Sequence, residues 1–255
     1  MKDVNLGYER IGKTNINNKG SSMKVIEYIT KGDIIVEFQD EYKARVHTSW
    51  SMFDKGLVKN PYIPSVYNIG IKGNKYPSKI NQKYTEEYRK WQNMLSRCYD
   101  KRFKESYAYK DVTCCEEWLL YENFYEWLHS QENYNQWISS NDRWSLDKDI
   151  LVKGNKIYSP NVCSLVPEKV NNLFIRKKSS RGELPIGVSK QGKYYASDCN
   201  GKYVGLSKTP EEAFEIYKIK KEESIKQIAQ EEYDKGNITK RCYNAMMNYE
   251  VEITD

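Results

Sequence analysis

The chain has 255 residues, of which 39% are hydrophobic and 30% charged, as in an ordinary soluble globular protein. Lys and Arg exceed Asp and Glu by 41 − 35 = 6, a mild excess that permits nucleic-acid binding without requiring it. No secretory signal follows Met1, and no apolar run approaches the roughly 20 residues that span a membrane. The six cysteines show no C-x-x-C spacing. We therefore expect a cytoplasmic protein with reduced thiols and no membrane partner.

Residues 1–80 predict a β-rich module. Short runs of β-branched and aromatic residues at 23–29, 33–39 and 42–48 are typical of strands. Gly, Pro and Asn then recur through 53–77, which argues against a long helix there. We expect a small barrel or a curled sheet.

Two amphipathic helices are predicted next, over residues 85–100 and 115–130. In the first, Tyr88, Trp91 and Cys98 recur at helical spacing, and the second repeats the pattern with Trp118 and further aromatics. We interpret these aromatic residues as core packing.

The stretch "LDKDILVKGNKIYSPNVCSLVP", residues 146–167, predicts a strand with Asp147 and Asp149, a Gly-Asn turn, and a second strand leading into a helix. This is the outline of a ββα finger that holds one divalent cation against a scissile phosphate. Such a site needs a carboxylate, an Asn or His ligand, and a general base that is normally a histidine.

Residues 88–173 carry three blocks in order: "WQNMLSRCYD", "YKDVTCCEEWLLYENFYEWL" and "LDKDI…GNKIYSPNVCSLVPEKVNN". The region resembles phage-type HNH endonuclease-like proteins. The resemblance implies a Mg²⁺-dependent DNA endonuclease centre with Asp147, Lys148 and Asp149 as candidate catalytic residues. It also implies that Asp147 is the metal carboxylate and that Asn171 or Asn172 is the ligand from the helix.

The motif departs from that pattern because Lys148 stands at the position of the histidine base. The two histidines, His47 and His129, lie elsewhere. As a base, Lys148 would need a pKa roughly three units below about 10.4, and the neighbouring Asp149 would raise that pKa instead.

Three interpretations of the finger remain open. The finger hydrolyses DNA with one Mg²⁺; or it is catalytically degenerate, needs no cofactor, and grips DNA with Lys148 as a phosphate ligand, which we favour. In the third, Asp147 and Asp149 lie on a solvated strand face and Asn155 serves only the turn.

The thiols allow one further metal site. Cys98, Cys115 and Cys163 fall in the same three blocks, and three thiolates with one more group could bind zinc. Because paired C-x-x-C knuckles are absent, buried apolar thiols are the favoured interpretation.

A basic linker follows the finger. Arg176, Lys177, Lys178 and Arg181 accompany two serines and a glycine, as expected of an exposed connector. Between two DNA-binding modules, these four side chains are candidates for phosphate contacts.

Residues 182–255 predict three strands and a helix. "IGVSKQ", "KYYASD" and "KYVGLS" are joined at Gln-Gly and Asn-Gly turns that favour hairpins, and Thr209, Pro210 and Glu212 form a helix start with a capping box. The pattern resembles the ethylene-response-factor type of DNA-binding domain of plants, which also occurs in phage endonucleases. That domain lays its sheet in the major groove.

Strand alternation predicts which side chains of this sheet face outward. Those are Ser189, Gln191, Lys193, Tyr195, Ser197 and Tyr203, of which Gln191, Lys193, Tyr195 and Tyr203 are candidate DNA contacts, whereas Val188, Tyr194, Ala196 and Val204 would face the helix. Since Lys193 is the single cation of the outward set, sequence specificity should be weak. A protein-binding face is the alternative.

These observations predict an α+β chain of three modules: a small β domain at 1–80, a helical HNH-like ββα-metal domain at 84–175, and a three-stranded antiparallel sheet with a helix at 182–255. The favoured function is a phage-encoded protein that binds double-stranded DNA and has a catalytically degenerate core. The alternatives are a metal-dependent homing-type DNA endonuclease, and a phage factor that binds a host protein such as an immune component. The first module also resembles one found ahead of HNH-like cores, which implies an accessory binding role.

Overall fold

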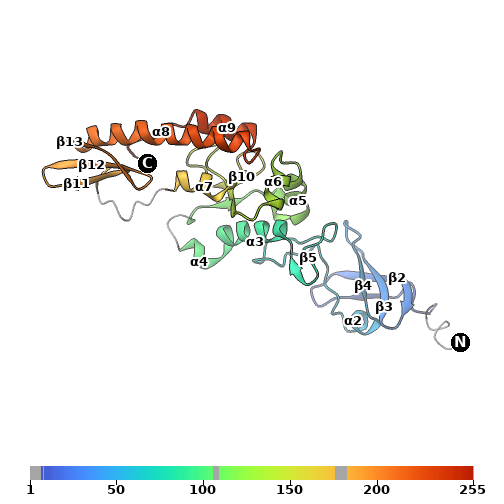
Figure 1. Ribbon diagram of the computed structural model, residues 1–255. Helices are drawn as coiled ribbons and strands as arrows, with labels where there is room; N and C mark the ends of the chain where they lie inside the picture. The colour runs from blue at the N-terminus through green and yellow to red at the C-terminus, as the bar shows by residue number, and fades with distance from the viewer. Residues whose placement is uncertain (1–6, 8, 106–108, 176–182, 255) are drawn as a thin grey trace. The chain divides into compact units, whose positions relative to one another are not determined.

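The computed structural model describes residues 7, 9–105, 109–175 and 183–254. The chain mixes helices and strands, which confirms the α+β prediction in its general form. It divides into two compact units, the first comprising Met1–Asp100 with Glu116–Tyr125 and the second Lys101–Cys115 with Glu126–Asp255. Figure 1 labels many of their elements. The three module ranges predicted from the sequence stay a prediction.

Unit 1 begins with an antiparallel meander of four strands. The strands are β1 (Thr14–Ile16), β2 (Ser22–Thr30), β3 (Asp33–Phe38) and β4 (Arg45–Thr48), in that order across the sheet. Alternate residues of β2 and β3 are buried around Phe53 of helix α2 (Trp50–Asp54), as a sheet with one covered face requires. The three predicted strands are confirmed, and the sheet is an open meander and not a barrel.

The remainder of unit 1 packs aromatic side chains around helix α3. Its elements are the hairpin β5 (Lys79–Ile80) and β6 (Lys83–Tyr84), α3 (Glu86–Tyr99), the 3₁₀ turn η1 (Glu116–Leu119), and α5 (Tyr121–His129), which continues into unit 2. Trp91 and Trp118 are fully buried, and Trp91 Nε1 donates to the Trp118 carbonyl at 2.7 Å. The predicted core role of these aromatics is confirmed. The second predicted helix is interrupted at Leu120, which bridges Ile71.

Unit 2 contains the ββα arrangement. Its first elements are α4 (Lys101–Lys104), β7 (Thr113–Cys114), α6 (Tyr134–Ser139), β8 (Trp144–Asp147), β9 (Ile157–Tyr158), β10 (Ser164–Pro167), α7 (Glu168–Asn171) and η2 (Asn172–Phe174). Strand β8 pairs antiparallel with β10, and α7 follows β10 directly. One detail of the prediction is wrong: β8 ends at Asp147, so Asp149 lies outside the strand, and the segment just after the Gly154–Asn155 turn pairs with β7 instead.

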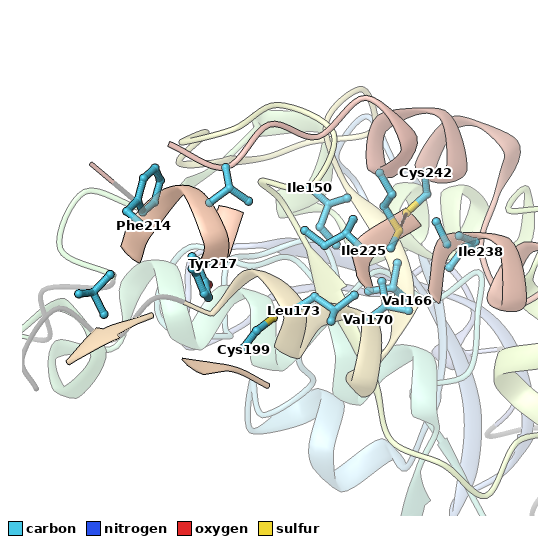
Figure 2. Close-up of a cluster of buried hydrophobic side chains, with 14 of the residues drawn as sticks. Ile150, Val166, Val170, Leu173, Cys199, Phe214, Tyr217, Ile225, Ile238 and Cys242 are labelled. Atoms are coloured by element: carbon cyan, nitrogen blue, oxygen red, sulfur yellow. Dashed lines mark hydrogen bonds between the residues drawn. The ribbon is translucent and has the colours of Figure 1, made fainter. Parts of the chain in front are cut away.

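The second half of unit 2 is a three-stranded sheet with two helices. They are β11 (Val188–Gln191), β12 (Tyr194–Cys199), β13 (Lys202–Ser207), α8 (Pro210–Asp234) and α9 (Lys240–Met247). The predicted capping box of Thr209 and Glu212 starts α8. Figure 2 shows that Val166 and Val170 of the finger belong to the same buried cluster as Phe214 and Ile225 of α8. Within unit 2, therefore, the finger and the sheet share a hydrophobic core.

Candidate functional site

The candidate site is the turn that follows β8, and Asp147 holds it together. Asp147 lies opposite Ser164 of β10 and is 8% exposed. Its Oδ1 accepts hydrogen bonds from the backbone N–H groups of Asp149 at 2.9 Å and Ile150 at 2.7 Å. Burial and the neighbouring Asp149 carboxylate raise the pKa of Asp147 to about 6. The side chain therefore caps its own turn, as Asp commonly does.

Lys148 is engaged within the same turn. Its Nζ lies 3.3 Å from Asp149 Oδ2, and its side chain is 13% exposed. Asn155 closes the other side, donating from Nδ2 to the Lys148 carbonyl at 2.5 Å and to the Ile157 carbonyl at 2.8 Å. Asn155 therefore closes the turn, and the Lys148 ammonium has an acid partner beside it. The interpretation that Asp147 and Asp149 lie on a solvated strand face is wrong, because Asp147 is buried and Asp149 lies beyond the end of β8.

The two asparagines predicted as metal ligands lie at the end of the finger helix. Asn171 is the last residue of α7 and half-buried, and Asn172 opens η2 and is exposed. Helix α7 packs against both β8 and β10, as the ββα arrangement requires. Their role as ligands stays a prediction.

One carboxylate oxygen of this turn is already engaged. Asp147 is buried and its Oδ1 accepts two backbone N–H groups, whereas Mg²⁺ binds one or two carboxylates together with water in octahedral geometry. In the described ranges, no group of three or more His, Cys, Asp and Glu side chains could hold a metal ion.

The cysteines favour the apolar interpretation. None of the six, all in the described part of the chain, forms a disulfide, and Cys98 and Cys163 are buried. Burial raises the pKa of the Cys163 thiol well above its ordinary value, as expected of a thiol in apolar surroundings.

The sheet of unit 2 turns different side chains outward from those predicted. Gln191 pairs directly with Tyr194 across the Gly192–Lys193 turn, so the two share a face, and Tyr194 is 46% exposed. Tyr195 packs against the buried cluster, and Ser197 is fully buried and donates to the Ala213 carbonyl at 2.6 Å. The predicted faces of all four residues 194–197 are wrong, Ala196 included, because the two-residue turn between the strands resets the alternation.

The outward face is consequently neutral to acidic. By pairing it carries Ser189, Gln191, Tyr194, Ala196, Asp198, Tyr203 and Leu206, and Ala196 is 4% exposed. Tyr203 is 61% and Leu206 44% exposed, and the face contains no Lys or Arg. Lys193 is exposed in the turn at the edge of this face. The remaining predicted phosphate contacts, Arg176, Lys177, Lys178 and Arg181, lie outside the described residues.

Two buried carboxylates were missed by sequence reasoning. In unit 2, the Glu232 side chain of α8 is 0% exposed and lies 2.7 Å from Lys169 Nζ of α7 and 3.1 Å from Lys235 Nζ. In unit 1, Glu122 accepts from the Tyr62 hydroxyl at 3.0 Å and from the backbone N–H groups of Asn74 and Lys75 at 2.9 and 2.7 Å. No local sequence signal shows that these glutamates are buried, since Lys169, which contacts Glu232, and the partners of Glu122 come from distant segments.

No described helix combines the length and apolar character needed to cross a membrane. Comparisons with known protein families, with curated proteins and with solved structures found no match to this chain.

Proposed function

We propose that this chain is a DNA-binding protein whose ββα finger has a structural role and does not hydrolyse DNA. The turn after β8 supports the proposal that the finger does not hydrolyse DNA. The Asp147 carboxylate is used to cap the turn, and the Lys148 ammonium is paired with Asp149. A general base and a metal ligand would both need a side chain that is available to water or phosphate.

DNA binding is supported by the order of elements and by charge. A ββα arrangement is followed in the same unit by a three-stranded sheet with a helix, which are the elements expected from the two resemblances. The net charge of +6 allows attraction to phosphates. The turn's lysine is largely buried, so we propose that DNA contact depends on other cations.

The decisive experiment measures binding and cleavage together. Duplex DNA is titrated at increasing salt, and supercoiled plasmid is incubated with Mg²⁺ or Mn²⁺. We expect affinity that falls with salt and no nicking. Nicking that disappears in Asp147→Asn but persists in Asp142→Asn would overturn the structural role and establish a metal-dependent endonuclease. Asp142 is an exposed carboxylate close by in the chain, and the Asn variant of Asp147 retains an oxygen that can accept both backbone N–H groups.

A protein-binding role is the second candidate, and the outward sheet face favours it. Tyr194, Tyr203 and Leu206 are exposed there, and the face lacks the cations that a phosphate backbone would select. Absence of DNA affinity even at low ionic strength would reject the first proposal. The double variant Tyr203→Ser, Leu206→Ser then tests this face, since a host-protein complex formed through it should be lost.

A further inference from the structure

Residues 55–85 of unit 1 concentrate positive charge. The segment holds six lysines and no Asp or Glu, and all six lysines are exposed: Lys55, Lys59, Lys72, Lys75, Lys79 and Lys83. Residues 9–54 of the same unit are balanced, with seven basic side chains (Arg10, Lys13, Lys19, Lys24, Lys31, Lys43, Arg45) and seven acidic ones (Glu9, Glu27, Asp33, Glu37, Asp40, Glu41, Asp54). The excess is therefore local and does not reflect the composition of the unit.

Two of these lysines stand on a defined hairpin. Lys79 pairs with Tyr84 and Ile80 with Lys83, and the two-residue loop Asn81–Gln82 has φ of 48° and 67°, the left-handed conformation of a tight hairpin turn. At the base, the Thr85 N–H donates to the carbonyl of Ser78 at 3.1 Å, and Ser78 is 5% exposed. The hairpin thus carries exposed lysines on an anchored backbone.

The aromatic residue of the hairpin positions a lysine. The Tyr84 ring stacks on Tyr88 of α3 with centroids 5.0 Å apart, and Lys79 Nζ lies 4.5 Å from the Tyr84 centroid. This cation–π contact holds the ammonium near the hairpin surface. Because Tyr84 is already engaged by Tyr88 and Lys79, it is poorly placed to stack on a nucleic-acid base.

Hydrogen bonds to the buried Glu122 carboxylate hold the loop at residues 72–75, before the hairpin. Gly73 has φ of 67°, and the next two residues, Asn74 and Lys75, donate their N–H groups to Glu122. Glu122 is 7% exposed, so its carboxylate is directed into the unit while Lys72 and Lys75 on either side of the turn are exposed. The surface of this loop is therefore cationic although a carboxylate lies beneath it.

We propose that residues 72–83 form a DNA-contact surface that binds backbone phosphates without reading base sequence. The proposal rests on the DNA-binding function proposed above and assigns to it a surface outside the finger and the C-terminal sheet. Lysine ammonium groups are compact charges that bind phosphate without the bidentate geometry by which Arg reads guanine. Phosphate contacts set affinity and salt dependence, whereas base contacts set specificity.

The test compares two triple variants of the full chain with equal loss of charge. Lys72→Gln, Lys79→Gln, Lys83→Gln removes three exposed lysines of the surface, and Lys13→Gln, Lys19→Gln, Lys24→Gln removes three exposed lysines from the balanced part of unit 1. Affinity for duplexes of two unrelated sequences is measured by fluorescence anisotropy across a salt series. We expect the first variant to bind both at least about tenfold more weakly, with the slope of log K against log salt reduced by roughly 0.9 for each lost phosphate contact.

Three results would overturn the proposed surface and leave the proposed DNA-binding function standing. They are unchanged affinity in the surface variant, equal weakening in the control variant, and loss of binding to phosphatidylserine vesicles rather than to duplex DNA. The triple variant Lys72→Arg, Lys79→Arg, Lys83→Arg keeps the three positive charges, and we expect it to bind DNA with the affinity of the wild type. A wild-type chain with no DNA affinity at low salt would overturn the proposed function together with this surface.

Discussion

Lys169 Nζ of the finger helix α7 lies 2.7 Å from Oε1 of Glu232, a residue of α8 whose side chain is 0% exposed. Lys235 and the Asn237 amide also contact the Glu232 carboxylate, at 3.1 and 2.9 Å. One carboxylate thereby links the finger helix to the helix that packs on the C-terminal sheet. Because three donors contact the Glu232 carboxylate, its charge can be buried where the finger helix meets α8.

Replacing Glu232 should destabilise unit 2. Glu232→Gln removes the charge that three donors share, and we expect the free energy of unfolding to fall by about 1.5–3 kcal/mol, the range for hydrogen bonds to charged groups. Urea denaturation followed by circular dichroism measures the change. Glu231→Gln, next to it but exposed, is the matched control and should change stability little. Equal effects of the two substitutions would contradict the role assigned to the cluster.

The same carboxylate should make stability depend on acid. Burial alone would raise the pKa of Glu232, but hydrogen bonds from Lys169, Asn237 and Lys235 outweigh it and lower the pKa below the ordinary value. A lowered pKa contributes stability above the unfolded pKa of about 4.3, and this contribution is lost as pH falls through the folded pKa. The difference in unfolding free energy between wild type and Glu232→Gln should therefore shrink below about pH 4. A constant difference across this range would argue against it.

Asp147 should behave in the opposite way. Its pKa is raised from 3.8 to about 6, so the folded chain binds a proton more tightly than the unfolded chain between these values. The Asp147 contribution to stability should then decrease as pH rises from about 4 to 6 and stay level above. Asp147→Asn keeps an acceptor for both backbone N–H groups and should lack this decrease, as measured by urea denaturation at several pH values.

Adding Mg²⁺ tests whether Asp147 caps the turn or binds a metal ion. A ligand that binds only the folded state raises the midpoint of thermal unfolding. We expect Mg²⁺ to leave that midpoint unchanged in wild type and in Asp147→Asn alike. A rise in wild type that is absent from the Asn variant would identify Asp147 as a metal ligand.

Gly73 should be more sensitive to substitution than Gly20, another glycine of unit 1 with positive φ. Its φ of 67° disfavours any side chain, and a Cβ there would clash with the Glu122 carboxylate. Gly20 has φ of 84° and open space around it, so Gly20→Ala measures the backbone penalty alone, about 1–2 kcal/mol. Gly73→Ala should cost clearly more than Gly20→Ala in thermal denaturation. Similar losses of stability in the two variants would mean that the Glu122 side chain can move away from the added methyl group.

Local sequence signals predicted the elements well, because each rests on residues close together in the chain. Thr209 caps α8 where expected, and the run of β-branched residues at 33–38 gives β3. The contact of Glu232 with Lys169 joins residues far apart in sequence, so no local pattern reveals it. The lysine-rich surface could have been found from the absence of Asp and Glu between 55 and 85.

The two serines on the hairpin β11–β12 test the corrected faces of the C-terminal sheet. Ser197 is fully buried and donates to the Ala213 carbonyl at 2.6 Å, whereas Ser189 is exposed and lies 3.5 Å from Asp198. Ser197→Ala should lower the free energy of unfolding by about 0.5–1.5 kcal/mol, the usual value of such a bond, and Ser189→Ala should change it by less than about 0.5 kcal/mol. Chemical denaturation of both variants measures this directly. A change below about 0.5 kcal/mol for both variants would restore the original assignment, in which Ser197 faces outward together with Ser189.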